Sequence, residues 1–136
     1  MKIFKEYMVG IVVISHSSKI AQGAVELAKQ MANNVKIIPA GVTKDNNIGT
    51  DIDLVLKAIY QAFDQNDGAI ILFDLGSALM NAQMAVELLE PEIQQKVEII
   101  DAALVEGTIL AAINSSMNKS IKEIKQELIN LKLNKI

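Results

Sequence analysis

The chain contains a single histidine, His16, whose position suggests chemistry. An apolar run, residues 9–14, and then Ser15 stand directly before it, and two more hydroxyl residues, Ser17 and Ser18, follow it. A lone histidine is more often structural or simply exposed, but this one stands where a strand gives way to a helix. An imidazole accepts a phosphoryl group when one ring nitrogen is unprotonated and an acceptor holds the other. His16 is therefore the candidate nucleophile.

A carboxylate that could hold the second ring nitrogen follows another apolar run. Residues 69–73 are apolar and end at Asp74, the first residue of an Asp-Leu-Gly-Ser stretch. In open α/β sheets, ligands bind beyond the carboxyl ends of the strands, where loops lead into helices. Asp74 is thus the candidate for orienting His16, although the same stretch could be only a turn. Asp101 also follows an expected strand, but we rank it lower because it could merely cap the next turn.

Five further residues are candidates for a phosphate pocket. A helix N-terminus offers free backbone N–H groups and the positive end of the helix dipole, which suit a phosphate. The residues that flank His16 or open the helices beside it are Ser17, Gly49, Thr50, Gly76 and Ser77. Thr50 and Ser77 could instead be plain helix caps. We assign Asp51 and Asp53 a structural role in the first turn of a helix, where the dipole favours carboxylates.

Several kinds of chemistry are excluded by what the sequence lacks. It has no cysteine and one histidine, which excludes thiolate and polyhistidine metal sites, and we expect no bound metal. The glycine motifs GxxxxGK(S/T) and GxGxxG, which bind nucleotides, are both absent, so we expect no nucleotide cofactor. All 13 basic residues are lysines, so the chain has no arginine clamp for phosphate. Without a second histidine as base, a serine hydrolase triad is disfavoured.

The distribution of charge and hydropathy indicates a cytoplasmic protein. The net charge is −3 and the lysines are scattered, which gives no footprint for nucleic acid. The apolar run near the N-terminus is too short to span a bilayer and has no cleavage site of a signal peptide after it. We therefore predict no nucleic-acid partner and no membrane association.

Apolar runs alternate with amphipathic segments along the chain, which predicts an α/β fold. Strands are expected at residues 9–15, 35–39, 69–73 and 97–100. The first expected helix follows His16, with Ile20, Ala24, Leu27, Ala28 and Met31 at helical spacing. A capping box at 50–53 opens a second helix that ends near 65, and Ser77 caps a third that reaches Leu89. Two more helices are expected at 108–116 and from 119 to about 133. The pattern predicts one domain, 1–136, with a mostly parallel sheet between helical layers.

Four stretches, taken in order, resemble the DhaM family. These are VVISHSSKIAQG at 12–23, NIGTDI at 47–52, LFDLGSALMNAQMAVELL at 72–89 and ALVEGT at 103–108. DhaM proteins are phosphocarrier subunits of phosphotransferase-dependent dihydroxyacetone kinases, with the fold of mannose-class IIA domains. The resemblance implies a sheet of strand order 2-1-3-4, a phosphohistidine at His16 and an orienting carboxylate at Asp74.

The resemblance also implies partners. Phosphorylated HPr would phosphorylate His16, and the carrier would then rephosphorylate ADP bound to a DhaL subunit, while DhaK holds the dihydroxyacetone. The nucleotide and its metal would belong to the partner, which agrees with the missing nucleotide motifs. A homodimer is also implied. Family members begin near Met8, so residues 1–7 are interpreted as an N-terminal extension.

Two other functions stay open. A IIA component of a mannose-class sugar transporter would share the fold and the phosphohistidine. Those proteins usually place glycine after the active histidine, whereas this chain has Ser17, which favours the kinase subunit. The second alternative is a non-catalytic regulatory module that senses the phosphorylation state of its partners.

Overall fold

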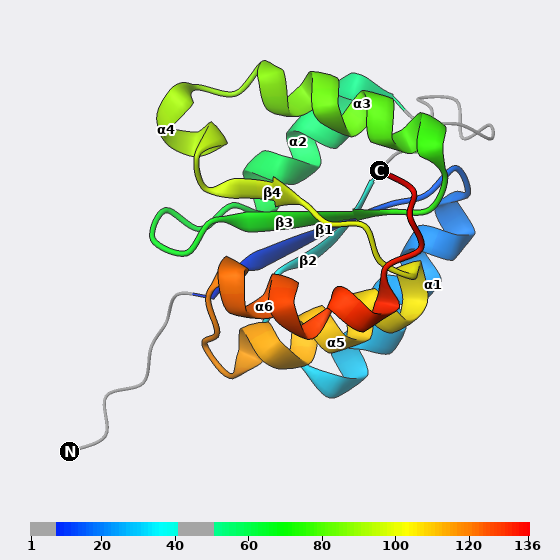
Figure 1. The fold of residues 1–136 in the computed structure, drawn as a ribbon, viewed down its shortest axis with the longest axis vertical. Helices are drawn as coiled ribbons and strands as arrows, with labels where there is room; N and C mark the ends of the chain where they lie inside the picture. Colours follow the sequence, from blue (N-terminus) through cyan, green and yellow to red (C-terminus); the bar gives the residue numbers. More distant parts are fainter. Residues whose placement is uncertain (1–7, 41–50) are drawn as a thin grey trace.

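A four-stranded parallel sheet lies between two layers of helices (Figure 1). The structure is a computed structural model and describes residues 8–40 and 51–136. The strand order is β2-β1-β3-β4, so the fold class and the strand order predicted from the sequence are both confirmed. The strands are β1 (Gly10–Ile14), β2 (Ile37–Ala40), β3 (Ala69–Phe73) and β4 (Val97–Ile99).

The two central strands are fully buried, which explains their uninterrupted apolar sequences. Every residue of β1 and β3 is buried, because helices cover both faces of the sheet. The edge strands β2 and β4 are shorter and partly exposed. Pro39 lies exposed in β2, and an edge position tolerates a residue that has no N–H to donate.

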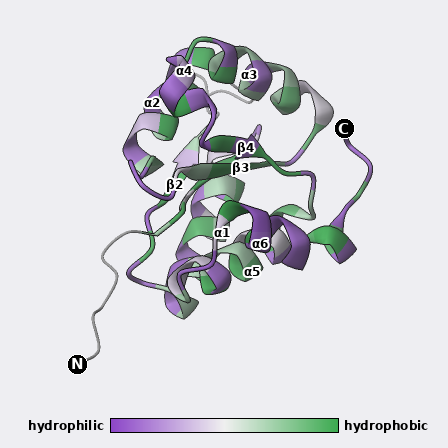
Figure 2. Ribbon diagram, turned by 60° about the vertical axis from the view of Figure 1, so that its left-hand side comes forward, coloured by the Kyte–Doolittle hydropathy of each residue, from purple (hydrophilic) through white to green (hydrophobic). Residues whose placement is uncertain are grey.

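The helices α1 (Ser18–Met31), α5 (Leu104–Ser116) and α6 (Ile121–Glu127) cover one face, and a 3-10 turn at Ile129–Leu131 follows. The opposite face is covered by α2 (Ile52–Ala62), α3 (Gly76–Glu87) and the short α4 (Pro91–Gln94). Successive residues of β1 enter opposite cores: Val13 packs in the first and Ile14 in the second. Figure 2 shows the mixed hydrophobic and hydrophilic colouring of the helices over a largely hydrophobic sheet.

Two glycines allow close backbone approaches. A Cβ at Gly10 would lie 1.8 Å from the carbonyl oxygen of Ala62, so the end of α2 rests directly on β1. Gly68 has a φ of 81° in the turn that leads into β3, a conformation that side chains disfavour. A Cβ at Gly68 would lie 2.0 Å from the carbonyl oxygen of Lys96, so Gly10 allows the approach of α2 to β1 and Gly68 allows the approach of Lys96 to the turn before β3.

Several predicted helix boundaries are wrong. The N-cap of α2 is Asp51, whose side chain accepts hydrogen bonds from the backbone N–H groups of Asp53 and Leu54, and not Thr50. Ser77 is not the cap of α3, which begins one residue earlier, after Leu75. Helix α2 ends at Ala62, before the predicted end near 65, and α5 begins at Leu104, before the predicted start at 108. The last predicted helix is divided into α6 and the 3-10 turn, and α4 was not predicted.

The predicted apolar face of α1 is only partly buried. Ala24 and Ala28 are buried, whereas Ile20, Leu27 and Met31 are about half exposed. The buried positions of α1 are Ala21, Ala24, Val25 and Ala28. Small side chains form the contact because α1 packs closely against α5 and the sheet, and the larger ones lie at its margin.

Candidate functional site

His16 and Asp74 meet where β1 and β3 end. The two strands pair in parallel with Ile14 opposite Phe73, so the residues that follow them leave the same edge of the sheet. The backbone N–H of Asp74 donates to the carbonyl oxygen of Ile14 over 3.1 Å, which extends the pairing by one residue. The predicted contact is present: Nδ1 of His16 lies 2.9 Å from Oδ1 of Asp74, across a sequence separation of 58.

The carboxylate of Asp74 accepts hydrogen bonds from four donors. Its Oδ1 faces the His16 ring and accepts from the backbone N–H of Leu75 over 2.7 Å. Its Oδ2 accepts from the Ser15 hydroxyl over 2.8 Å and from the backbone N–H of His16 over 3.0 Å. Burial alone raises the pKa of Asp74, but these bonds lower it, and the net pKa lies below the ordinary value of 3.8. The group is therefore a carboxylate at neutral pH.

The ionised carboxylate decides which ring nitrogen of His16 is free. Because a carboxylate only accepts hydrogen bonds, Nδ1 must carry the proton that it shares with Asp74. In the neutral ring, Nε2 then keeps its lone pair. The Ser77 hydroxyl lies 2.5 Å from Nε2 and is placed to donate to it. The side chains of His16 and Asp74 are each 18% exposed, so the pair is sheltered and still reachable from solvent.

Ser15 is a part of the site that the sequence did not reveal. It is completely buried at the end of β1, donates to Asp74, and accepts from the backbone N–H of Ser17 over 3.0 Å. The sequence pattern indicates no role for Ser15, because a serine nucleophile would need a base that the chain does not offer. A buried hydroxyl at the end of a strand needs a hydrogen-bond partner. This requirement could have indicated from the sequence that Ser15 contacts a polar group of the site.

Helices α1 and α3 both begin beside the imidazole. Ser17 is the N-cap of α1 and accepts from the backbone N–H of Ile20 over 3.4 Å, so its hydroxyl already has a structural role. Gly76 and Ser77 form the first turn of α3, and a Cβ at Gly76 would meet no atom within 4 Å. Gly49 and Thr50 lie outside the described residues. The phosphate pocket therefore stays a prediction, supported by the placement of Ser17, Gly76 and Ser77.

Asp101, the carboxylate that follows β4, has a different set of partners. It accepts hydrogen bonds from the backbone N–H groups of three residues near the C-terminus, which are Leu133, Lys135 and Ile136. It does not cap the next helix, because the N-cap of α5 is Ala103, without a side-chain bond. Asp101 thus anchors the last segment of the chain.

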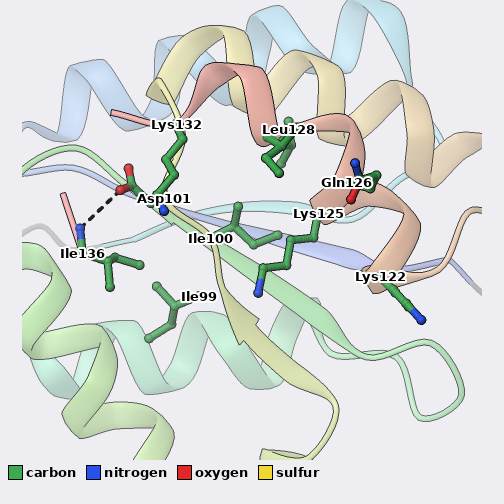
Figure 3. Close-up of a pocket in the computed structure, with 10 residues that line it drawn as sticks. Ile99, Ile100, Asp101, Lys122, Lys125, Gln126, Leu128, Lys132 and Ile136 are labelled. Atoms are coloured by element: carbon green, nitrogen blue, oxygen red, sulfur yellow. Dashed lines mark hydrogen bonds between the residues drawn. The ribbon is translucent and has the colours of Figure 1, made fainter. Parts of the chain in front are cut away.

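A hollow lies beside Asp101 and away from His16. It measures about 390 Å³ and is enclosed by β4, α6 and the last segment (Figure 3). Its lining residues include Ile99, Ile100, Lys125 and Ile136. Among the residues that the structure describes, no group of histidine and carboxylate side chains could hold a metal ion. In the same part of the chain, no helix is long and apolar enough to cross a membrane.

Several known proteins have sequences similar to that of this chain. Residues 10–125 match the family described as PTS system fructose IIA component. A Listeria innocua protein, "PEP-dependent dihydroxyacetone kinase 2, phosphoryl donor subunit DhaM", is 42% identical over 91% of this chain and 99% of its own length. The DhaM subunit of the corresponding Escherichia coli kinase is also 42% identical, over 86% of this chain.

The relatives differ in length. The chain spans only 25% of the Escherichia coli relative, in contrast to almost all of the Listeria protein. A crystal structure of a protein of unknown function has a TM-score of 0.82 and 31% identity, covering 91% of this chain and 95% of that one. The resemblance noted in the sequence is therefore confirmed.

Proposed function

We propose a phosphoryl-carrier function for this protein, on the premise that the chain belongs to the family of PTS system fructose IIA components. The observation that carries the proposal is the hydrogen bond of 2.9 Å between Nδ1 of His16 and Asp74. It leaves Nε2 as the nucleophilic atom, at the partly exposed edge where a second protein can reach it. His16 is the proposed carrier, and Asp74 is the group that orients it.

The transfer follows from the tautomer of His16. The lone pair of Nε2 forms a bond to phosphorus while the bond between phosphorus and the donor's nitrogen breaks, and the donor nitrogen keeps that electron pair. The phosphorylated ring gains positive charge because Nδ1 keeps its proton, and the carboxylate of Asp74 stabilises it. The Ser77 hydroxyl must release Nε2 and becomes available to a phosphoryl oxygen. The first turn of α3 offers further N–H donors to that group.

We infer that the carrier serves a dihydroxyacetone kinase. In support, the Listeria innocua relative named as a DhaM phosphoryl donor subunit matches this chain over nearly its full length. Its donor would be HPr, its acceptor would be ADP held by a DhaL subunit, and DhaK would bind the dihydroxyacetone. ADP and its metal would then stay with the partner. We expect the relay to take place in the cytoplasm.

A IIA component of a sugar transporter is the second candidate, because the family description itself names a fructose IIA component. The serine that follows His16 argues for the kinase. Both functions use the same phosphohistidine and differ only in the acceptor. The choice between them therefore depends on which partner discharges the phosphorylated protein.

The test is a reconstituted relay. Incubation with enzyme I, HPr and phosphoenolpyruvate should add one phosphoryl group, visible by intact mass, that is lost in acid. The isolated phosphoprotein is then mixed separately with free ADP, with the DhaL–ADP complex, and with the soluble domain of a mannose-class transporter. Fast discharge by the DhaL–ADP complex alone supports the proposal. Discharge by the transporter domain alone identifies the second candidate, and a protein that takes up no phosphoryl group contradicts both.

A homodimer is part of the same proposal. Apolar side chains exposed on α3, at Met80 and Met84, and at its C-cap Leu88 are compatible with burial in an interface. Light scattering at micromolar concentration measures the mass directly. A single species of 14.8 kDa would show that the chain is a monomer.

A further inference from the structure

The last residues of the chain lie across the carboxyl ends of β3 and β4. Figure 1 shows this segment, in red, passing from the helical layer that contains α6 toward the strand ends. The segment is fastened by Asp101, which is 8% exposed and accepts hydrogen bonds from three of its backbone N–H groups. Figure 3 shows the bond from Ile136. Its path is therefore held by a buried carboxylate.

The backbone turns sharply just before Lys135. Asn134 has a φ of 60°, in the left-handed region that asparagine tolerates better than most residues. The next residue, Lys135, donates its backbone N–H to Oδ2 of Asp101 over 2.5 Å. Asn134 and Asp101 together fix the point from which the lysine side chain starts.

The ammonium group of Lys135 joins the end of β3 to the segment that follows β4. Its Nζ lies 2.6 Å from the carbonyl oxygen of Phe73 and 2.9 Å from that of Ala102. It also lies 4.5 Å from the centre of the Phe73 ring, a distance typical of a cation–π contact. Phe73 is the last residue of β3 and immediately precedes Asp74. The lysine therefore forms a hydrogen bond to the backbone directly before the orienting carboxylate.

Two carboxylates compensate the charge that is brought into this partly buried position. Burial lowers the pKa of Lys135, while the negative charges of Asp101 and Asp74 oppose that shift. Asp74 is thus within electrostatic reach of the ammonium group as well as in contact with His16. The chain has no arginine, and this lysine brings a positive charge to the protein side of the site.

We propose that Lys135 is a positioning residue for phosphoryl transfer: it ties the end of β3 to the segment after β4 and thereby fixes Asp74 against His16. The proposal rests on the carrier function inferred above. When a phosphoryl group arrives on His16, negative charge accumulates near Asp74. The ammonium group, which interacts electrostatically with Asp74, offsets part of that charge, so the carboxylate keeps its place on Nδ1.

The test compares Lys135→Met, which keeps an unbranched side chain without its charge, with Lys132→Met as the matched control. Lys132 belongs to the same segment but is exposed. We expect Lys135→Met to lower the maximal rate of phosphorylation by HPr about tenfold, with KM for HPr changed less than about twofold. The NMR signal of the His16 Nδ1 proton should shift or broaden. Lys132→Met should change neither, and Lys135→Arg should restore part of the rate.

A purely structural role predicts a different result. If Lys135→Met lowers only the melting temperature, with the rate and the Nδ1 proton signal unchanged, the positioning role is wrong. If Lys135→Met does not fold, Asn134→Val keeps the lysine and disturbs its backbone, with Asn134→Gly as the control that permits the positive φ. The proposal then requires the valine variant alone to be slow. The Nδ1 signal is read without any phosphoryl donor, so it tests Lys135 even if the carrier function fails.

Discussion

Asp74 and Asp101 occupy equivalent places in the fold and have different partners. Each is an aspartate at the carboxyl end of the sheet, Asp74 directly after β3 and Asp101 two residues after β4, and the two strands are neighbours. Asp74 accepts from an imidazole, a hydroxyl and two backbone N–H groups. Asp101 accepts only backbone N–H groups in the bonds described above. A carboxylate at a strand end thus provides an acceptor, and its partner decides whether it serves chemistry or structure.

The strand order explains the difference. β3 lies beside β1, so Asp74 emerges next to His16, which follows β1. Among the described strands, β4 lies at the edge of the sheet beside β3, and the last segment of the chain lies beyond its end. The same residue type therefore meets an imidazole at one strand end and main-chain amides at the other.

Removal of the imidazole should have the largest effect on phosphorylation at the end of β1. His16→Ala should abolish phosphorylation by HPr, because no other described side chain at this edge offers an unprotonated nitrogen. The fold should survive, since His16 is partly exposed and lies outside the two cores. Intact mass after incubation with the donor measures the first effect, and circular dichroism the second. A fully active variant would end the carrier hypothesis.

Asp74→Asn should have the second largest effect. The amide keeps the shape of the carboxylate but loses its charge, and its nitrogen can present a donor to Nδ1. The His16 tautomer is then no longer enforced, and we expect phosphoryl transfer to slow about a hundredfold. Stopped-flow measurement of transfer from HPr gives the rate. A rate equal to that of the unmodified protein would separate Asp74 from the chemistry.

Asp101→Asn is the matched change at the other strand end. It should lower the free energy of unfolding by about 1–3 kcal/mol, because three N–H groups of the last segment lose a charged acceptor. Through Lys135 it should slow transfer less than about tenfold, well short of the effect at Asp74. Denaturant titration and the same rate assay check the two numbers. Equal losses of rate at both aspartates would overturn the distinction drawn here.

The smallest effect concerns the acid stability of the protein. The hydrogen bonds at Asp74 hold its pKa below 3.8, the value that applies to the unfolded chain. Asp74 therefore contributes stability that is fully present above about pH 4 and is lost as the pH falls through the lowered pKa. The stability difference between the unmodified protein and Asp74→Asn should narrow in this range. Urea titrations between pH 5 and about pH 3 measure it, and a constant difference would contradict the assignment.

The sequence predicted best what depends on continuous patterns. Buried parallel strands require long apolar runs, so β1 and β3 were recognised within about a residue. The strand order came from the family resemblance and not from the pattern. Helix starts were less predictable because neighbouring polar residues compete for the cap, as Asp51 does with Thr50. At α3 the Ser77 hydroxyl turned out to face the imidazole.

Contacts between distant segments were the least predictable part of the site. Ser15 and Asp74 are 59 residues apart, and no periodicity connects them. The same holds for Asp101 and Lys135, which are 34 residues apart. Lys135 is one of several scattered lysines, and nothing in the sequence distinguishes it from the others. Its hydrogen bond to the carbonyl oxygen of Phe73 is therefore visible only in the structure.

Because β1 pairs with β3, the site can form only after much of the chain has been synthesised. His16 is made early, but the residues that face its two ring nitrogens, Asp74 and Ser77, follow 58 and 61 positions later. A nascent chain that ends within β2 carries the histidine without either of them, and the long loop must close before they meet. Uptake of a phosphoryl group on the ribosome would therefore report that β3 has docked, which makes the reaction itself a probe of cotranslational folding.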